Sequence, residues 1–132
     1  MDPVPEEALP PDDALARAEE LLAAGRAFGA HEVLEAAWKA APAAERELWR
    51  GLAQVAVGLC HLQRGNRRGA VALLRRGSER VAGFAGRAPH RIAARAVAAT
   101  ARGLAERADA GEDVPVPALP LRQPEGCDPE AR

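Results

Sequence analysis

Four residues within segment 27–40 could form a chemically active face of a helix. Phe28, His31, Glu35 and Trp38 are spaced by three, four and three positions, which places them on one side of a helix. An imidazole and a carboxylate between two aromatic rings indicate a face shielded from water, so we expect Phe28 and Trp38 to be largely buried. A shielded carboxylate needs a partner, and His31 lies one helical turn from Glu35. The spacing therefore predicts a polar cluster on this face.

A second line of residues, in segment 43–64, could complete the cluster. Glycine weakens a helix by about 1 kcal/mol relative to alanine. We therefore expect a neighbouring helix to approach closely at the two glycines of this line and so to compensate for this loss of stability. That approach would bring the two polar members of the line toward His31 and Glu35. The line consists of Gly51, Gln54, Gly58 and His61.

Two histidines and a carboxylate can bind a divalent metal ion, because imidazole and carboxylate groups are ordinary ligands of zinc and iron. In this interpretation His31, Glu35 and His61 are the ligands, and Glu32 is a candidate catalytic base of a hydrolase-like enzyme. The string His31–Glu35 is not the HExxH motif of zinc proteases, since a glutamate takes the place of the second histidine.

The same residues also fit a structural role. A polar cluster of His31, Glu35, Trp38, Gln54 and His61 can form a buried hydrogen-bond network. Such a network fixes the register of helices without any catalysis. The sequence therefore favours a structural or interaction module, with the metal-dependent enzyme and its divalent metal cofactor as the alternative.

Three further residues predict a turn and a helix cap. Gly65 and Asn66 follow a strongly periodic helical segment, and both tolerate the left-handed backbone conformation that commonly ends a helix. The Asn66 side chain is expected to accept a hydrogen bond from a backbone N–H near Arg68 or Gly69. Gly69 would then pack close to a neighbour, because it has no side chain.

The elements that must position these residues are helices. Aromatic residues make up 3% of the chain and tyrosine is absent, so alanine, leucine and valine must build the core, which suits closely packed helices. Apolar residues recur at helical spacing through most of the chain. We expect an all-α fold, a compact antiparallel bundle or array of about five helices. They span roughly residues 12–24, 27–40, 43–64, 67–83 and 89–109, with His90 at the surface where the last one starts.

Proline-rich segments delimit a single domain. Residues 1–11 and 111–132 are expected to be extended and to stay outside the core, which leaves 12–110 as one helical domain. No apolar run approaches the roughly 20 residues that a membrane helix needs. The acidic N-terminus is unlike a signal peptide. We therefore expect a cytoplasmic protein that does not bind membranes.

Charge is distributed unevenly along the chain, although the net charge is −1. The net charge is −6 over residues 1–63, +9 over residues 64–107 and −4 over residues 108–132. The arginine-rich segment 64–107 makes an anion or nucleic-acid binder the second alternative. The scarcity of aromatic residues for base stacking argues against nucleic acid. We expect the arginines to face acidic residues of the first helix or the tail, and a homo-oligomer is left open.

The motifs resemble those of one known family. The segments FGAHEVLEAAW (28–38) and GLAQVAVGLCHLQRGNRRGAVALL (51–74) are similar to the pattern AHE-x-LE-x-x-W, then GL-x-Q…H-x-x-x-GN-x-x-GA. This is the pattern of the bacterial and plastid domain of unknown function family 309. The resemblance implies an all-helical fold and supplies no activity.

A helical hairpin is also indicated by the spacing of Gly58, Gly65, Ala70 and Leu74, which resembles one tetratricopeptide hairpin. No second copy is evident, and arrays of such hairpins need about three repeats to bury a continuous core. We interpret the spacing as ordinary packing of a helix pair.

Overall fold

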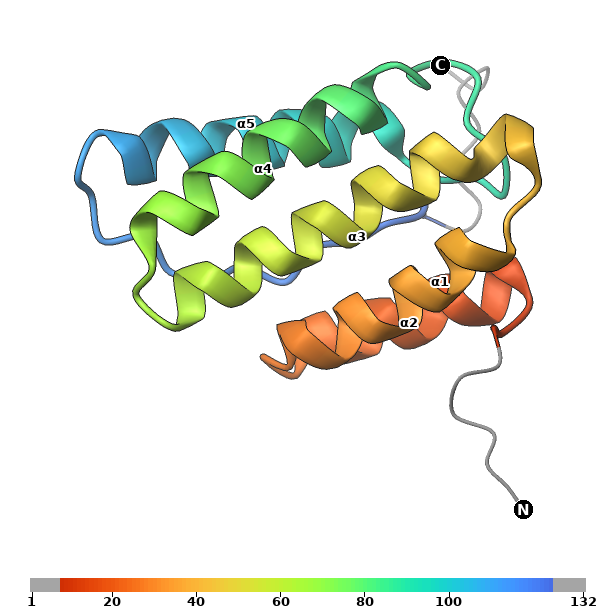
Figure 1. The fold of residues 1–132 in the computed structure, drawn as a ribbon, viewed down its shortest axis with the longest axis horizontal. Coiled ribbons are helices and arrows are strands. Elements are labelled where there is room, and N and C mark those ends of the chain that lie inside the picture. The colour runs from red at the N-terminus through yellow and green to blue at the C-terminus, as the bar shows by residue number, and fades with distance from the viewer. Residues whose placement is uncertain (1–7, 125–132) are drawn as a thin grey trace.

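The computed structural model describes residues 8–124, and its regular secondary structure there is helical (Figure 1). The helices are α1 (Pro11–Ala23), α2 (Ala27–Ala40), α3 (Ala43–Gln63), α4 (Arg67–Ala82) and α5 (Ala94–Asp109). Over residues 8–124, the expected all-α array of five helices is confirmed. Among the described residues, no helix is both long enough and apolar enough to cross a membrane.

The helices pack as an open array. Substantial contacts join each helix to the next one in sequence, from α1–α2 through to α4–α5. The α1–α2 pair lies at one edge and the α4–α5 pair at the other, with α3 between them (Figure 1). Within residues 8–124, no contact of comparable extent joins α1 to α5. Among the described residues, the two outermost helices are therefore not packed extensively on each other.

The turns between α1 and α2 and between α3 and α4 have the same geometry. Gly25 and Gly65 both have φ +76, and each follows the last turn of its helix. In the first turn the N–H of Arg26 donates to the carbonyl of Leu21 at 2.8 Å. In the second, the N–H of Asn66 donates to the carbonyl five positions earlier at 2.9 Å. Both are Schellman motifs, in which glycine adopts the left-handed conformation without steric cost.

The sequence therefore does contain a second copy of the helical hairpin, contrary to expectation. Ala30 and Leu34 of α2 correspond to Ala70 and Leu74 of α4, and all four are at most 1% exposed. The α1–α2 hairpin was not recognised from the sequence because only its glycine, alanine and leucine positions match those of the α3–α4 hairpin. These are the positions at which the turn and the helix packing restrict the choice of residue.

Helix α5 begins later than expected, at Ala94 instead of about residue 89. His90 and Arg91 have φ values of 59 and 58, in the left-handed region, so the helix cannot start at them. Ile92 then forms an isolated antiparallel bridge with Arg122. His90 is half-buried, and its Nε2 lies 3.0 Å from Oε1 of Glu45, so it is not a surface residue at a helix start.

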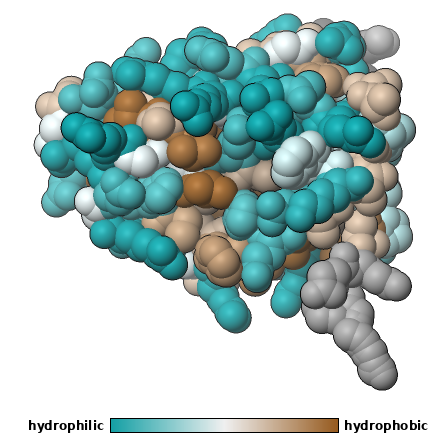
Figure 2. Space-filling view, viewed as in Figure 1, coloured by the Kyte–Doolittle hydropathy of each residue, from teal (hydrophilic) through white to brown (hydrophobic). Residues whose placement is uncertain are grey.

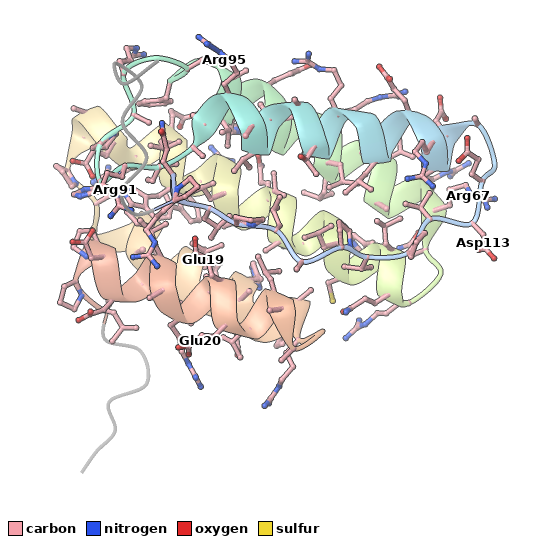
Figure 3. All side chains as sticks on the ribbon, turned by 180° about the vertical axis from the view of Figure 1, so that it is seen from behind. Glu19, Glu20, Arg67, Arg91, Arg95 and Asp113 are labelled. Carbon is pink, nitrogen blue, oxygen red and sulfur yellow. The ribbon has the colours of Figure 1, made fainter. Side chains whose placement is uncertain are left out.

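The chain beyond α5 packs back onto the helices. After Gly111 it runs along the rear of the array between α1 and α5 (Figure 3). Leu119 and Leu121 are 5% and 1% exposed and belong to the core. The expectation that this tail stays outside the core is wrong. Proline prevents helix formation there, but an extended chain still directs alternate side chains to one face. We call residues 114–124 the strap.

Candidate functional site

Helix α2 carries the first residues that the sequence singles out for chemistry. Nε2 of His31 lies 3.8 Å from Oε1 of Glu35, one helical turn away. The two side chains are 22% and 38% exposed, so the pair lies at the edge of the surface and is not sealed from water. Glu32, the candidate base, is exposed. The buried side of the helix is formed by Ala27, Ala30, Leu34 and Ala37.

The two aromatic rings of α2 lie in different environments. Phe28 is 53% exposed, and its ring centroid is 5.7 Å from that of His31. The prediction that Phe28 is buried is wrong: Ala27 occupies the buried position, and the next residue is turned by about 100° around the helix. Trp38 is partly buried against the core, and the Arg50 guanidinium lies 5.3 Å from its ring centroid. Trp38 therefore packs beside α3, whereas Phe28 faces solvent.

The line of small and polar residues on α3 faces α4. A Cβ added at Gly58 would lie 2.7 Å from Cγ of Leu74 on α4. Gln54, on the same line, accepts a hydrogen bond from Nε of Arg80 on α4 at 3.0 Å. The expected close approach of a helix is present, but the helix that approaches is α4 and not α2. The polar side chains of this line are therefore used in the α3–α4 contact.

His61 is part of the turn between α3 and α4. Oδ1 of Asn66 accepts a hydrogen bond from the backbone N–H of Gly69 at 3.0 Å, which caps the N-terminus of α4. Nδ2 of the same side chain lies 3.1 Å from Nδ1 of His61. A Cβ at Gly69 would lie 3.0 Å from the His61 ring, so a side chain there would crowd the imidazole. Asn66 thus caps α4 and also holds His61 at the corner.

The predicted metal ligands are not arranged as a metal site. Within residues 8–124, no group of three or more His, Cys, Asp or Glu side chains is placed to hold a metal ion. His31 and Glu35 form a pair on α2, whereas His61 is bound to Asn66 at the α3–α4 corner. Figure 2 shows that the face formed by α2, α3 and α4 is mostly hydrophilic, with small hydrophobic areas. The polar residues are thus divided among separate local contacts.

One family model matches the part of the chain that holds these contacts. Residues 15–73 match the model described as Domain of unknown function (DUF309). The chain resembles DUF309. The match begins in α1 and ends in α4, so it includes both motifs on which the resemblance was predicted, and the DUF309 segment excludes α5 and the strap. No match was found among curated proteins or among solved structures.

Outside the motifs of DUF309, the structure contains a buried tryptophan that was not singled out from the sequence. Trp49 of α3 is 1% exposed, and its Nε1 donates to Oε1 of Glu45 at 3.2 Å. The same oxygen faces Nε2 of His90, which connects α3 to the segment before α5. The available signal was a glutamate one turn before a tryptophan, a spacing at which the two side chains can meet.

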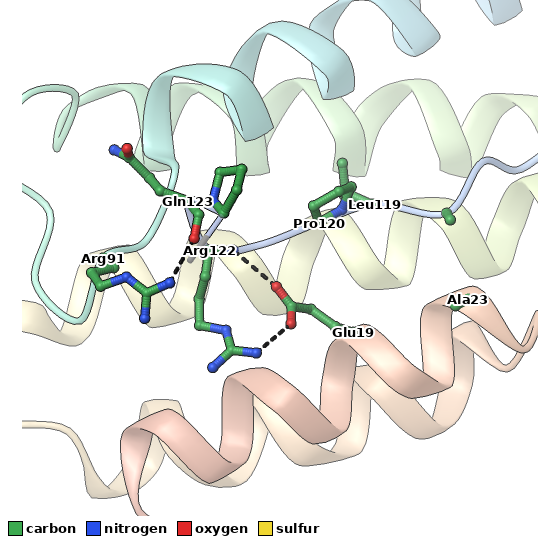
Figure 4. Close-up of a pocket in the computed structure, with 9 residues that line it drawn as sticks. Glu19, Ala23, Arg91, Leu119, Pro120, Arg122 and Gln123 are labelled. Atoms are coloured by element: carbon green, nitrogen blue, oxygen red, sulfur yellow. Dashed lines mark hydrogen bonds and ion pairs between the residues drawn. The ribbon is translucent and has the colours of Figure 1, made fainter. Parts of the chain in front are cut away.

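Glu19 of α1 makes three hydrogen bonds to the strap (Figure 4). Its Oε2 accepts from the backbone N–H groups of Leu121 and Arg122, both at 2.9 Å, and its Oε1 accepts from Nη2 of Arg122 at 2.7 Å. Burial raises the pKa of Glu19, but the Arg122 side chain and the two N–H groups stabilise the carboxylate more, so the pKa lies below its ordinary value. Sequence reasoning missed Glu19 because these partners lie 102 and 103 positions away.

The segment before α5 binds the other side of the strap. The N–H of Ala93 donates to the carbonyl of Leu121 at 2.8 Å, and the N–H of Gln123 donates to the carbonyl of Arg91 at 2.8 Å. Nη2 of Arg91 also donates to the Gln123 carbonyl at 2.7 Å. The strap is therefore held between α1 and the start of α5 largely through its backbone. We call this place, defined by Glu19 on one side and Arg91–Ala93 on the other, the α1–α5 groove.

The arginine-rich segment is partly neutralised within the fold. Nη2 of Arg75 lies 3.1 Å from Oδ2 of Asp109 on α5. Arg80 pairs with Glu47 on α3. The acidic partners of these two arginines are thus on α3 and α5, whereas Arg107 pairs with Glu112 of the tail, as expected. The arginine that does reach α1 is Arg122 of the strap, outside segment 64–107.

Proposed function

We propose that this chain is a non-catalytic helical interaction module that holds an extended polypeptide segment in the α1–α5 groove. The observation that carries the proposal is the strap itself. Its backbone N–H groups donate to the Glu19 carboxylate, its backbone also bonds to Arg91 and Ala93, and its own Leu119 and Leu121 side chains are buried. Recognition of an extended backbone combined with pockets for alternate side chains is a common way to bind peptides.

Open hollows flank the strap. An open hollow of about 440 Å³ lies between Glu19 and Pro120, and one of about 640 Å³ lies between Arg91 and Gln123. A third, of about 400 Å³, adjoins α5 beside Pro115. These hollows open to solvent, so both flanks of the strap are accessible from outside the protein.

The helices themselves supply a framework that does not depend on the strap for their mutual contacts. Each of them packs on its sequence neighbour, and the strap lies across α1 and α5, which share no extensive contact within the described residues. The anion-binding alternative has less support, because Arg75, Arg80 and Arg107 each pair with a carboxylate.

Exchange of the strap against a free peptide tests the proposal. A protease recognition sequence inserted after Gly111 allows the chain to be cut between α5 and the strap while every residue remains present. We expect the cut chain to keep its helical circular dichroism and to take up a fluorescently labelled peptide of residues 112–124. Binding is measured as a saturable rise in fluorescence anisotropy, reversed by unlabelled peptide.

Glu19→Ala in the cut chain is the matched control for the position of binding. It removes an ionised acceptor of three hydrogen bonds, so we expect at least about tenfold weaker uptake of the peptide. Two results would contradict the proposal. One is no uptake of the labelled peptide, and the other is loss of helicity on cutting, which would make the strap an inseparable part of the core.

A further inference from the structure

We infer that the α1–α5 groove recognises partner proteins through an extended segment of the type Leu-Pro-Leu-Arg, and that the strap is a built-in competitor for the same site. This inference rests on the proposed function and adds the chemistry of the partner and the regulation of the groove. The observations that carry it are the alternation of buried side chains along the strap, the pairing of Arg122 with Glu19, and the backbone contacts that flank them.

The strap fills the groove with two leucine side chains. Leu119 and Leu121 are buried, whereas Pro120 between them is exposed. Because successive side chains of an extended chain point to opposite faces, residues two apart share one face. A partner segment therefore needs two leucine-like side chains separated by one residue. The residue between them meets solvent, so proline is tolerated there.

Arg122 supplies a charged contact beside the second leucine. Its Nη2 lies 2.7 Å from Oε1 of Glu19, and the two side chains are 26% and 23% exposed. A charge-assisted hydrogen bond at a partly shielded site is stronger than one between neutral groups. An arginine directly after the second leucine is therefore the feature that distinguishes a matching segment from any other apolar extended segment.

The groove also forms hydrogen bonds with the backbone of the residues on both sides of this arginine. The carbonyl of Leu121 accepts a hydrogen bond from the N–H of Ala93, and the N–H of Leu121 donates to Glu19. The N–H of Gln123 donates to the carbonyl of Arg91. These contacts require an extended conformation. The prolines of the strap restrict the free segment to extended conformations, which lowers the entropy cost of binding. Proline-containing segments are thus better suited to the groove than flexible ones.

The strap competes with such a partner because it is tethered nearby. Only Ala110–Asp113 separate the end of α5 from the first strap residue, Val114. Because the tether is this short, the effective concentration of the strap at the groove is at least on the order of millimolar. A partner in solution at micromolar concentration is therefore largely excluded until the strap is released. The strap keeps the groove closed in the free protein.

Peptide variants test the recognition without changing the protein. In the cut chain, we expect peptides 112–124 carrying Arg122→Ala or Leu121→Ala to bind at least about tenfold more weakly than the unchanged peptide. Asp113 is exposed and precedes the strap, so the Asp113→Ala peptide is the matched control, expected to bind within about threefold of the unchanged peptide. The intact chain should bind the unchanged peptide at least about tenfold more weakly than the cut chain does.

The outcomes separate this inference from the proposed function. If the cut chain binds all four peptides equally, the groove holds extended segments but does not read Leu-Pro-Leu-Arg, and the inference is wrong while the proposed function stands. If the intact chain binds as tightly as the cut chain, the strap is not a competitor. A concentration-dependent dimer of the intact chain in sedimentation, lost after cutting, would assign the groove to the strap of a second copy and overturn the assignment to a partner.

Discussion

Trp49→Ala is expected to lower the free energy of unfolding by about 3–5 kcal/mol, the usual cost of truncating a buried aromatic residue. The side chain is 1% exposed and fills the core where α3 meets the segment before α5. Its removal leaves a cavity and also takes away the hydrogen bond from Nε1 to Glu45. Urea denaturation followed by circular dichroism measures the loss.

Trp38→Ala is the matched control, because it removes the same side chain from a partly buried position. Trp38 contacts the core on one side and the Arg50 guanidinium on another, so we expect a smaller loss of about 1–2 kcal/mol. An equal or larger loss at Trp38 than at Trp49 would contradict the assignment of Trp49 as the central aromatic residue of the core.

Gly77→Ala is expected to destabilise the protein by about 1–3 kcal/mol, although alanine is the better helix former. A Cβ at Gly77 would lie 2.7 Å from Cγ2 of Val55 and 2.8 Å from the backbone oxygen of Gly51. The backbone oxygen cannot rotate away, so α3 and α4 would have to separate. Their separation would loosen the contact that the two helices make along the line of Gly51 and Gly58.

Gly103→Ala provides the control for helix propensity alone. Gly103 lies within α5, and a Cβ added there meets no atom within 4 Å. We expect this variant to be more stable than the wild type by about 0.5–1 kcal/mol. Thermal denaturation of both variants should therefore give shifts of opposite sign. A stabilising Gly77→Ala substitution would show that α3 and α4 do not approach as closely as described.

The helices were predictable because their signals are local. Gly25 and Gly65 end α1 and α3 as their sequence context indicates, and Pro42 precedes the start of α3. The start of α5 was not predictable from Pro89, because the bridge between Ile92 and Arg122 comes from a distant part of the chain. The same holds for the strap, whose prolines indicate only that it is not helical.

The helix face on which each residue of the candidate cluster lies was predictable from the sequence. Which of these residues contact one another was not. The glycines of α3 correctly predicted that a helix approaches closely, but they do not specify which helix. Gly77 on α4 was the available signal, since glycines on two facing helices allow the backbones to meet. Once α4 takes that position, Gln54 and His61 face it and not His31. A pattern of residues on one helix therefore predicts that another helix packs closely against it, but not which helix this is.

The most direct measurement asks whether His31, Glu35 and His61 bind a metal or serve local contacts. Protein prepared without a histidine tag is titrated with Zn²⁺ and, separately, with Fe²⁺ under anaerobic conditions, and binding is followed by calorimetry. Because His61 is held by Asn66 and the ligand set is not assembled within residues 8–124, we predict no stoichiometric site. Binding of one metal ion per chain that is lost in both His31→Ala and His61→Ala, while both variants stay folded, would contradict this prediction.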